Sequence, residues 1–189
     1  MTTTSEQTRI PDYLTGTWTI DRDHSEVGFM VRHLMVTKVR GRFTGFTGEL
    51  VTAEDPGASS VEATIDLATV DTGHPDRDAH LRSADFLDVE RYPTMSYRST
   101  AVRWDGEDLV VDGDLTLHGV TRPVPLVLEV HGFQEHTPFG DARAGFSART
   151  EINRSDFGIT FNMPMDNGGV VVGDRVRVDL DIEAIRTAA

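Results

Sequence analysis

Residues 176–183 read Val-Arg-Val-Asp-Leu-Asp-Ile-Glu, with an apolar side chain at every second position. Because successive side chains of a β-strand point to opposite faces, this stretch predicts a strand with one face in a core and the other in water. The same alternation recurs at 27–33, 61–67, 95–98, 111–117, 124–130 and 144–149. The sequence therefore predicts an all-β protein.

With Trp18–Ile20 and the glycine-rich stretch 41–48, these segments give about eight strands. Glycines inside strands often mark the bends that a closing sheet needs, and Asp105-Gly106 is a hairpin turn signal. No change of composition suggests a second domain. We therefore expect one antiparallel β-barrel of about eight strands over residues 14–186, preceded by a disordered tail at 1–13.

The stretch 77–97 interrupts the alternation and is rich in charge. It predicts one short helix near residues 76–84, because Pro75 suits a first helical turn and Asp76 and Asp78 would lie at the positive end of the helix dipole. Arg77, Asp78 and His80 could also suggest general acid–base chemistry. The helix-end explanation accounts for the acidic residues without a reaction, so we favour a structural role.

Composition excludes several classes of function. The formal net charge is −13, from 31 acidic and 18 basic residues, and such a surface repels nucleic acid and anionic membranes, although a local basic patch stays open. No apolar run approaches the ~20 residues of a membrane helix, so we expect no stable membrane insertion. The absence of cysteine excludes disulfides and thiol catalysis. The polar N-terminus lacks a signal-peptide pattern and predicts a cytoplasmic protein.

Several motifs occur in order along residues 16–185: Trp18–Asp21, His24–Phe29 with His33, Gly41–Phe43, Asp71–Gly73, Arg77–Ser83, Asp85–Asp88 with Tyr92-Pro93, Gly113–Thr121 and Asn153–Gly158. Each motif is weak alone, but the ordered set resembles the YceI-like family of polyisoprenoid-binding, lipocalin-like proteins. The chain departs from many members in lacking a secretory signal. It also carries a stretch, 162–169, that matches no motif of the family.

The resemblance implies an extended lipocalin-like barrel with an apolar tunnel that holds an isoprenoid or a similar amphipathic lipid. It implies no settled catalytic activity. We expect a carrier, store or scavenger with no catalytic residues, cofactor or metal, and we leave a homodimer open. Inward-facing residues would form the tunnel wall. The residues expected to bind the ligand are Phe29, Val31, His33, Phe43, Phe86, Met95, Tyr97, Phe146 and Phe157.

Three alternatives stay open from the residues themselves. A barrel of about eight strands can also be filled by its own side chains. An enzyme acting on a quinone-like or lipid-like substrate could use His33 or His80, and an interaction module could form a dimer through strand edges. Serine catalysis is disfavoured, because His24 and Ser25 point to opposite faces of a strand.

The remaining histidines and one charged pair are expected to be structural. No zinc-like spacing occurs among the seven histidines. We expect His24 and His118 to hold loop backbones through their ring nitrogens. We also expect Arg154 and Asp156 to form an ion pair that fixes a loop beside Phe157.

Overall fold

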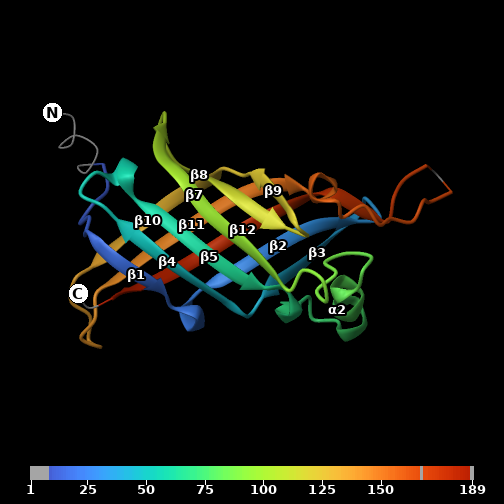
Figure 1. Ribbon diagram of the computed structural model, residues 1–189, viewed down its shortest axis with the longest axis horizontal. Helices are drawn as coiled ribbons and strands as arrows, with labels where there is room; N and C mark the ends of the chain where they lie inside the picture. Colours follow the sequence, from blue (N-terminus) through green and yellow to red (C-terminus); the bar gives the residue numbers. More distant parts are fainter. Residues whose placement is uncertain (1–8, 167, 188–189) are drawn as a thin grey trace.

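The computed structural model describes residues 9–166 and 168–187 and shows a long antiparallel barrel (Figure 1). Eight strands close into a ring, because β12 pairs with β1 as well as with β11. In ring order they are β1 (Gly16–Ile20), β4 (Phe46–Thr52), β5 (Ser60–Asp66), β7 (Thr94–Asp105), β8 (Asp108–Leu117), β10 (Leu126–Gln134), β11 (Arg143–Asn153) and β12 (Val172–Arg186). The predicted antiparallel barrel is confirmed.

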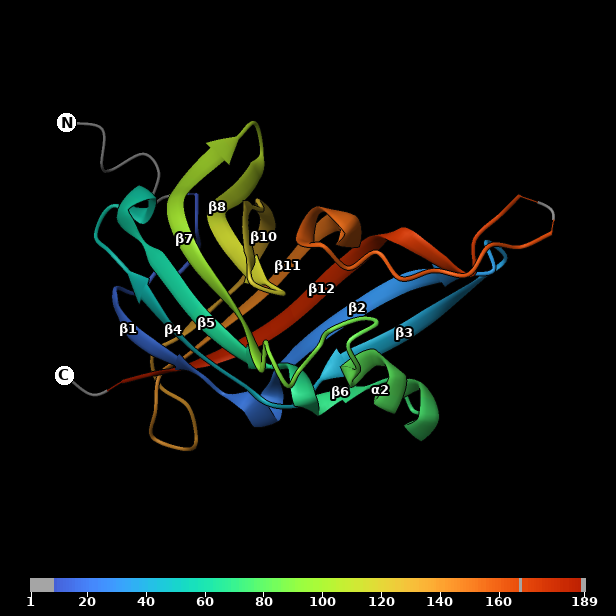
Figure 2. The same ribbon diagram turned by 45° about the vertical axis from the view of Figure 1, so that its right-hand side comes forward.

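The barrel is extended by a second set of strands along one half of β12. β2 (Glu26–His33) pairs with residues 172–181 of β12, whereas β1 pairs with residues 184–186. β3 (Thr37–Phe43) and the short β6 (Val70–Asp71) continue outward from β2. β9 (Val120–Pro123) pairs with β8. The long β12 thus joins the closed ring to a projecting β2–β3 hairpin (Figure 2).

One α-helix, α2 (Pro75–Arg82), lies in the described part of the chain, as predicted within two residues. Its charged side chains hold the preceding loop. Asp78 is buried and accepts hydrogen bonds from the Thr72 backbone N–H at 2.9 Å and from the Thr72 hydroxyl at 2.6 Å. Arg82 donates to the Ala68 and Val70 carbonyls at 2.7 and 3.0 Å. These charges are used in fixing the chain beside the barrel.

Four short 3-10 turns follow the ends of β1, β4, β5 and β11. They are η1 (Arg22–His24), η2 (Pro56–Ala58), η3 (Leu67–Thr69) and η4 (Arg154–Phe157). The predicted Asp105-Gly106 turn joins β7 to β8, with Gly106 at a φ of 65°. Within the described residues, we find no helix of the length and apolarity needed to cross a membrane.

The chain before β1 packs on the barrel from residue 9 onward. Ile10 is 5% exposed, and the Tyr13 hydroxyl donates to the Ala53 carbonyl at 2.7 Å. Residues 1–8 of the expected tail lie outside the described residues. The part of that tail at 9–13 is therefore ordered, because Ile10 and Tyr13 supply apolar surface for one end of the core.

Trp18 is the centre of that end of the core. It has no exposed surface, its indole N–H donates to the Thr52 hydroxyl at 2.8 Å, and its ring meets the Phe133 ring edge-on at 5.5 Å. A buried indole needs such an acceptor, because an unpaired N–H in a core is costly. Trp18 therefore fixes β1 against β4 and β10 at this end of the barrel.

Candidate functional site

The interior of the closed ring contains a cavity of about 220 Å³. Inward residues of all eight ring strands contribute to its wall, and nearly all of them are apolar. The lining includes Ile20, Phe46, Leu50, Val61, Ala63, Ile65, Met95, Tyr97, Val111, Leu115, Leu126, Leu128, Phe133, Phe146, Ala148, Ile152, Val178, Leu180 and Ile182. This wall offers apolar contact and almost no hydrogen bonding.

A second apolar cavity, of about 130 Å³, lies between β2, β3, β12 and the α2 region. Met95, Ile152 and Val178 line both cavities, so the two spaces adjoin at these three side chains. Ligand pockets commonly span ~300–1,000 Å³, and the two spaces joined reach the lower end of that range. A rearrangement of the Met95 side chain, which is flexible, would connect them.

Two of the polar groups that line the larger cavity, Tyr97 and Thr52, already have partners. The Tyr97 hydroxyl lies 3.1 Å from the Val111 carbonyl and 3.0 Å from the Val124 carbonyl. Burial raises the pKa of Tyr97, so the phenol stays neutral. The Thr52 hydroxyl donates to the Leu14 carbonyl at 2.7 Å. The interior is therefore suited to an apolar chain and has no free charged group to hold a polar one.

Seven of the nine residues expected to bind a ligand line these cavities. Phe29, Val31, Phe43 and Phe86 line the smaller one. Tyr97 and Phe146 line the larger one, and Met95 lines both. Their role in ligand binding stays a prediction, but their placement agrees with it.

The other two residues, His33 and Phe157, line neither cavity. His33 shares a strand face with Val31 but is the last residue of β2, and the strand continues past the end of the smaller cavity. Phe157 lies in η4 and is 1% exposed, packed in the core beside the cavity. A role of His33 and Phe157 in ligand binding stays a prediction that their placement outside these two cavities does not support.

Sequence reasoning missed residues of the wall that the structure now identifies. Ile152, Val178 and Leu180 were recognisable as inward residues from their alternation or their position in a strand. The alternation identifies an inward face but does not show which inward residues border a void, because that depends on how opposite strands meet.

The histidines lie outside both cavity walls. His80 Nε2 lies 2.8 Å from Asp85 Oδ2, and its ring meets the Phe86 ring edge-on at 5.0 Å. His118 Nδ1 lies 3.2 Å from the Phe157 carbonyl oxygen, so it contacts a loop backbone as expected. His80 therefore packs behind a wall residue, Phe86, but borders neither cavity itself.

His24 contacts a carboxylate instead of a loop backbone. Its Nδ1 lies 2.8 Å from Asp21 Oδ2, which raises the pKa of His24 and lowers the pKa of Asp21. Asp21, His24 and Glu183 lie close enough to hold a cation. However, Arg143 contacts both carboxylates, with Nη1 3.2 Å from Asp21 Oδ2 and a very short contact to Glu183. The guanidinium supplies the positive charge that this cluster needs.

Arg143 gives the fold a dependence on acid pH. Its hydrogen bonds to Asp141 lower the pKa of that carboxyl. A lowered pKa stabilises the fold above the unfolded value of ~3.9, and this contribution is lost as the pH falls through the folded value. We therefore expect Arg143→Gln to lower the melting temperature at pH 7, with a smaller difference from wild type at pH 3. Thermal unfolding followed by circular dichroism measures both differences.

Arg98→Gln provides the matched control. Arg98 pairs with Glu62 at 2.6 Å, but both side chains are more than half exposed, and an exposed pair contributes only ~0–1 kcal/mol. Equal melting shifts for the two variants at pH 7, or a pH-independent shift for Arg143→Gln, would contradict this role of Arg143.

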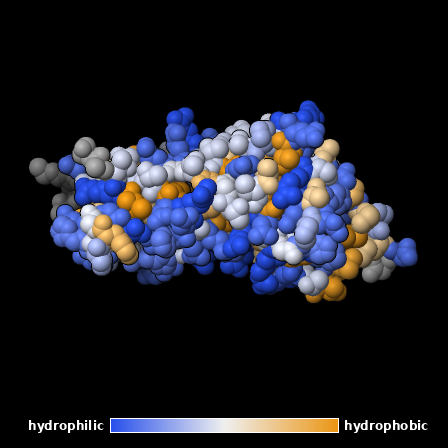
Figure 3. All heavy atoms as spheres, turned by 90° about the horizontal axis from the view of Figure 1, so that it is seen from below, coloured by the Kyte–Doolittle hydropathy of each residue, from blue (hydrophilic) through white to orange (hydrophobic). Residues whose placement is uncertain are grey.

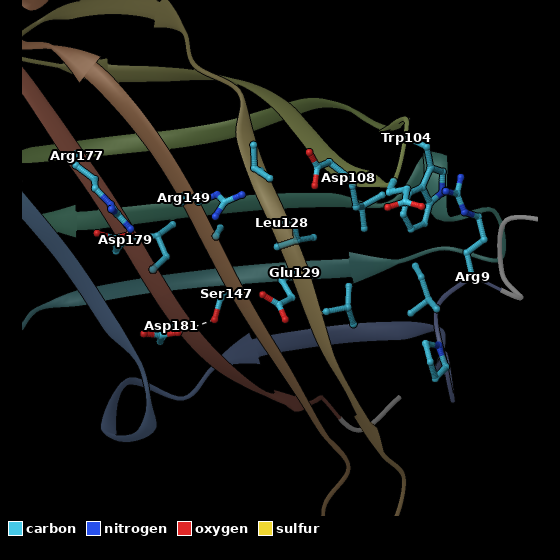
Figure 4. A pocket seen from close by; sticks show the side chains of 18 residues that line it. Arg9, Trp104, Asp108, Leu128, Glu129, Ser147, Arg149, Arg177, Asp179 and Asp181 are labelled. Atoms are coloured by element: carbon cyan, nitrogen blue, oxygen red, sulfur yellow. Dashed lines mark hydrogen bonds and ion pairs between the residues drawn. The ribbon is translucent and has the colours of Figure 1, made fainter.

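A further pocket lies on the outer face of the barrel. Its volume of about 510 Å³ exceeds that of either interior cavity, and it lies over β10, β11 and β12 (Figure 4). Some of its charged side chains have partners: Arg177 Nη2 lies 2.7 Å from Asp179 Oδ1, and the Ser147 hydroxyl donates to Asp181 at 2.6 Å. Glu129 and Arg149 also line it and form no ion pair among the described residues. Its lining mixes both signs of charge with apolar groups, whereas the interior wall is almost wholly apolar, so the interior is the better candidate site for an apolar ligand.

Arg154 closes the smaller cavity without forming the expected ion pair. The side chain is 7% exposed and lines that cavity. It donates hydrogen bonds to four backbone carbonyls, those of Ile159, Phe161, Val172 and Gly173. Burial lowers its pKa, but a guanidinium keeps its charge in proteins. Arg154 therefore fixes a loop as expected, through carbonyls instead of Asp156.

The closed antiparallel ring and its apolar interior define a small β-barrel protein with an internal cavity. The chain belongs to the YceI-like family: the YceI-like domain model matches residues 18–184. It is 45% identical to protein YceI of Escherichia coli O17:K52:H18 over 143 residues, which are 74% of each chain. It is 43% identical to a UPF0312 protein of Enterobacter sp. strain 638 over 147 residues, 76% of each chain.

Solved structures share the fold. BcnA of Burkholderia cenocepacia superposes with a TM-score of 0.70 at 22% identity, covering 87% of this chain and 98% of that one. The YceI protein of Campylobacter jejuni gives a TM-score of 0.68 at 26% identity, with 83% and 90% covered. A protein of Saccharophagus degradans, described as a polyisoprenoid binding domain implicated in plant cell wall breakdown, gives a TM-score of 0.68 at 20% identity, with 92% and 100% covered.

Proposed function

We propose that this protein binds an isoprenoid or a similar long-chain lipid inside the barrel and acts as a carrier, store or scavenger. The observation that carries the proposal is the pair of adjoining cavities, whose walls are almost wholly apolar and whose Tyr97 and Thr52 hydroxyls already have partners. The Saccharophagus degradans structure, described as a polyisoprenoid binding domain, supports the same ligand class.

Burial of the chain supplies the affinity. Each CH₂ group removed from water contributes ~0.8 kcal/mol, so one five-carbon isoprene unit contributes up to about 3 kcal/mol. A few units reach roughly micromolar affinity after the cost of association. Since the interior wall is almost wholly apolar, selection would rest mainly on the length and width of the apolar chain.

We propose binding without catalysis. The histidines that suggested an enzyme lie outside the cavity walls, and His80 is held by Asp85. A reaction would need a base or nucleophile within hydrogen-bond reach of the bound chain. The cytoplasmic location and the homodimer stay predictions, which cell fractionation and analytical ultracentrifugation test.

A series of isoprenols tests the ligand class. We expect protein stripped of lipid to bind alcohols of one, two, three and four isoprene units with affinity that rises about tenfold or more per unit, until the chain exceeds the interior. Titration calorimetry measures the affinities, and a negative heat-capacity change should accompany binding. Affinity that is independent of chain length would contradict burial inside the barrel.

A further inference from the structure

Five of the six exposed large hydrophobic residues of the described chain gather at one end of the barrel. Leu34, Met35 and Val36 form the β2–β3 turn and are 39%, 50% and 82% exposed, whereas Met163 and Val170 lie in the facing segment and are 51% and 37% exposed. We call these five residues the barrel tip. Figure 3 shows hydrophobic side chains concentrated toward this end of the molecule.

The two parts of the barrel tip are held together by backbone hydrogen bonds. The Leu34 N–H donates to the Val171 carbonyl at 2.8 Å, and His33 is paired with Val172. Pro164 and Val170 form an isolated bridge within the facing segment. The turn and the facing segment are therefore joined at the base of the tip, which extends beyond the strands (Figure 2).

The turn residues are unusual for their backbone conformation. Leu34 and Met35 have φ values of 51° and 60°. Successive residues with positive φ favour Asn and Gly, and a bulky side chain there costs stability. Leu34 and Met35 still leave 39% and 50% of their surface exposed, so the packing they give the fold is incomplete, which points to a use outside the fold.

The β2–β3 hairpin that carries one half of the tip is basic, although the whole chain is acidic; in the facing segment, Asp166 is an exposed acidic side chain, so the cations of the hairpin outnumber it. No Asp or Glu occurs from residue 27 to residue 48, whereas Arg32, Lys38, Arg40 and Arg42 do. Arg32, Lys38 and Arg40 are exposed and form no ion pair among the described residues. Acidic groups elsewhere on the barrel are screened beyond ~8 Å at physiological salt. The tip therefore presents a local positive surface.

The tip also adjoins the apolar interior. Val31 and Val172 line the smaller cavity, and they lie on the two strands that end at the tip, β2 and β12. An apolar surface at the end of the strands that border an apolar cavity, with cations beside it, matches the boundary between phospholipid headgroups and acyl chains.

We propose that the barrel tip docks on anionic phospholipid membranes. The apolar side chains of the tip would enter the headgroup–acyl boundary, and Arg32, Lys38 and Arg40 would contact lipid phosphates. Docking would place the smaller cavity against the bilayer that contains its ligand; this last step rests on the proposed lipid binding, whereas docking itself does not.

Flotation with unilamellar vesicles tests the docking. We expect wild-type protein to float with vesicles of phosphatidylglycerol and phosphatidylcholine, and weakly with phosphatidylcholine alone. Leu34→Asn combined with Met35→Gly should lower the partition coefficient on the order of tenfold or more, while the melting temperature is unchanged or raised, because these residues suit positive φ. Phe139→Ser, which removes an 80% exposed apolar side chain at the opposite end, should leave partition unchanged.

Charge neutralisation tests the electrostatic part. Lys38→Gln combined with Arg40→Gln should lower partition onto the anionic vesicles about 25-fold, because each cation near such a surface is worth about fivefold. The control pair, Arg22→Gln with Arg149→Gln, carries the same charge change away from the tip and should shift partition less than about twofold. Equal losses for the two pairs would overturn the assignment of the tip.

A site-specific label locates the contact, since the chain contains no cysteine. An environment-sensitive fluorophore on Val36→Cys should shift to the blue with anionic vesicles, and the same label on Phe139→Cys should not. If the wild-type protein does not float with anionic vesicles, the proposed docking is overturned. One such case is that ultracentrifugation shows a dimer, in which the tip only joins two copies of the chain. If the wild-type protein floats but binds no isoprenol, docking stands and the proposed function fails. If it binds isoprenol but does not float, docking alone is rejected.

Discussion

Ala148→Trp is expected to lower the affinity for a long isoprenol by about 100-fold or more. Ala148 is buried on β11, faces the larger cavity, and lies across from Leu128 on β10 and Leu180 on β12. An indole at this position takes the space of at least one isoprene unit, and losing ~3 kcal/mol of burial corresponds to about two orders of magnitude in affinity. Titration calorimetry measures the loss.

Arg149→Trp is the matched control, because the neighbouring side chain on the same strand points outward. Arg149 is exposed, so its replacement should leave isoprenol affinity within about threefold of wild type. Unfolding in urea should show that Ala148→Trp costs less than ~3 kcal/mol, since the cavity accepts part of the added volume. Ala63→Phe, on β5, repeats the test from another strand. If Ala148→Trp and Ala63→Phe fold but still bind the isoprenol with wild-type affinity, binding in this cavity is contradicted.

Arg154→Leu is expected to lower the free energy of unfolding by about 3 kcal/mol. The guanidinium donates to four carbonyls that link η4, the segment after it and the start of β12. Leucine removes all four donors, and a buried carbonyl left without a partner costs ~1–3 kcal/mol. Some of these carbonyls regain a hydrogen bond from water, so the loss of unfolding free energy is smaller than the summed cost of four unpaired carbonyls. Urea denaturation measures the change.

Arg122→Leu serves as the comparison for Arg154→Leu. Arg122 is exposed and donates one hydrogen bond, to the Asp156 carbonyl at 3.2 Å. Its loss should cost less than ~1 kcal/mol, as is usual for surface substitutions. If Arg154→Leu and Arg122→Leu lose similar amounts of unfolding free energy, the buried donors of Arg154 contribute little to stability. Arg154→Lys should fall between wild type and Arg154→Leu, because an ammonium cannot reach as many carbonyls from one position.

The sequence predicts the wall of this barrel better than its interior. Alternation in residues 176–183 identifies β12, because the two-residue period follows from backbone geometry alone. It does not show that β12 has 15 residues and pairs with β1 at one end and β2 at the other. That division depends on which distant strands meet, which local pattern does not specify.

The cavity depends on side-chain arrangements that local pattern also leaves open. A Cβ placed on Gly113 would lie 2.4 Å from the Tyr97 ring, so this glycine lets the ring lie against β8, where the hydroxyl reaches two carbonyls. His33 has the correct alternation for an inward residue, but β2 extends beyond the cavity there. Whether an inward residue borders a void or a packed core is a property of the assembled barrel.

A crystal structure of the protein loaded with an isoprenol of four units tests the central claim most directly. We expect continuous elongated density through the larger cavity, beside Ala148 and Phe146, that passes Met95 toward Phe86 in the smaller cavity. A saturated protein whose isoprenol lies only on the outer surface, with both cavities closed by side chains, would contradict the account.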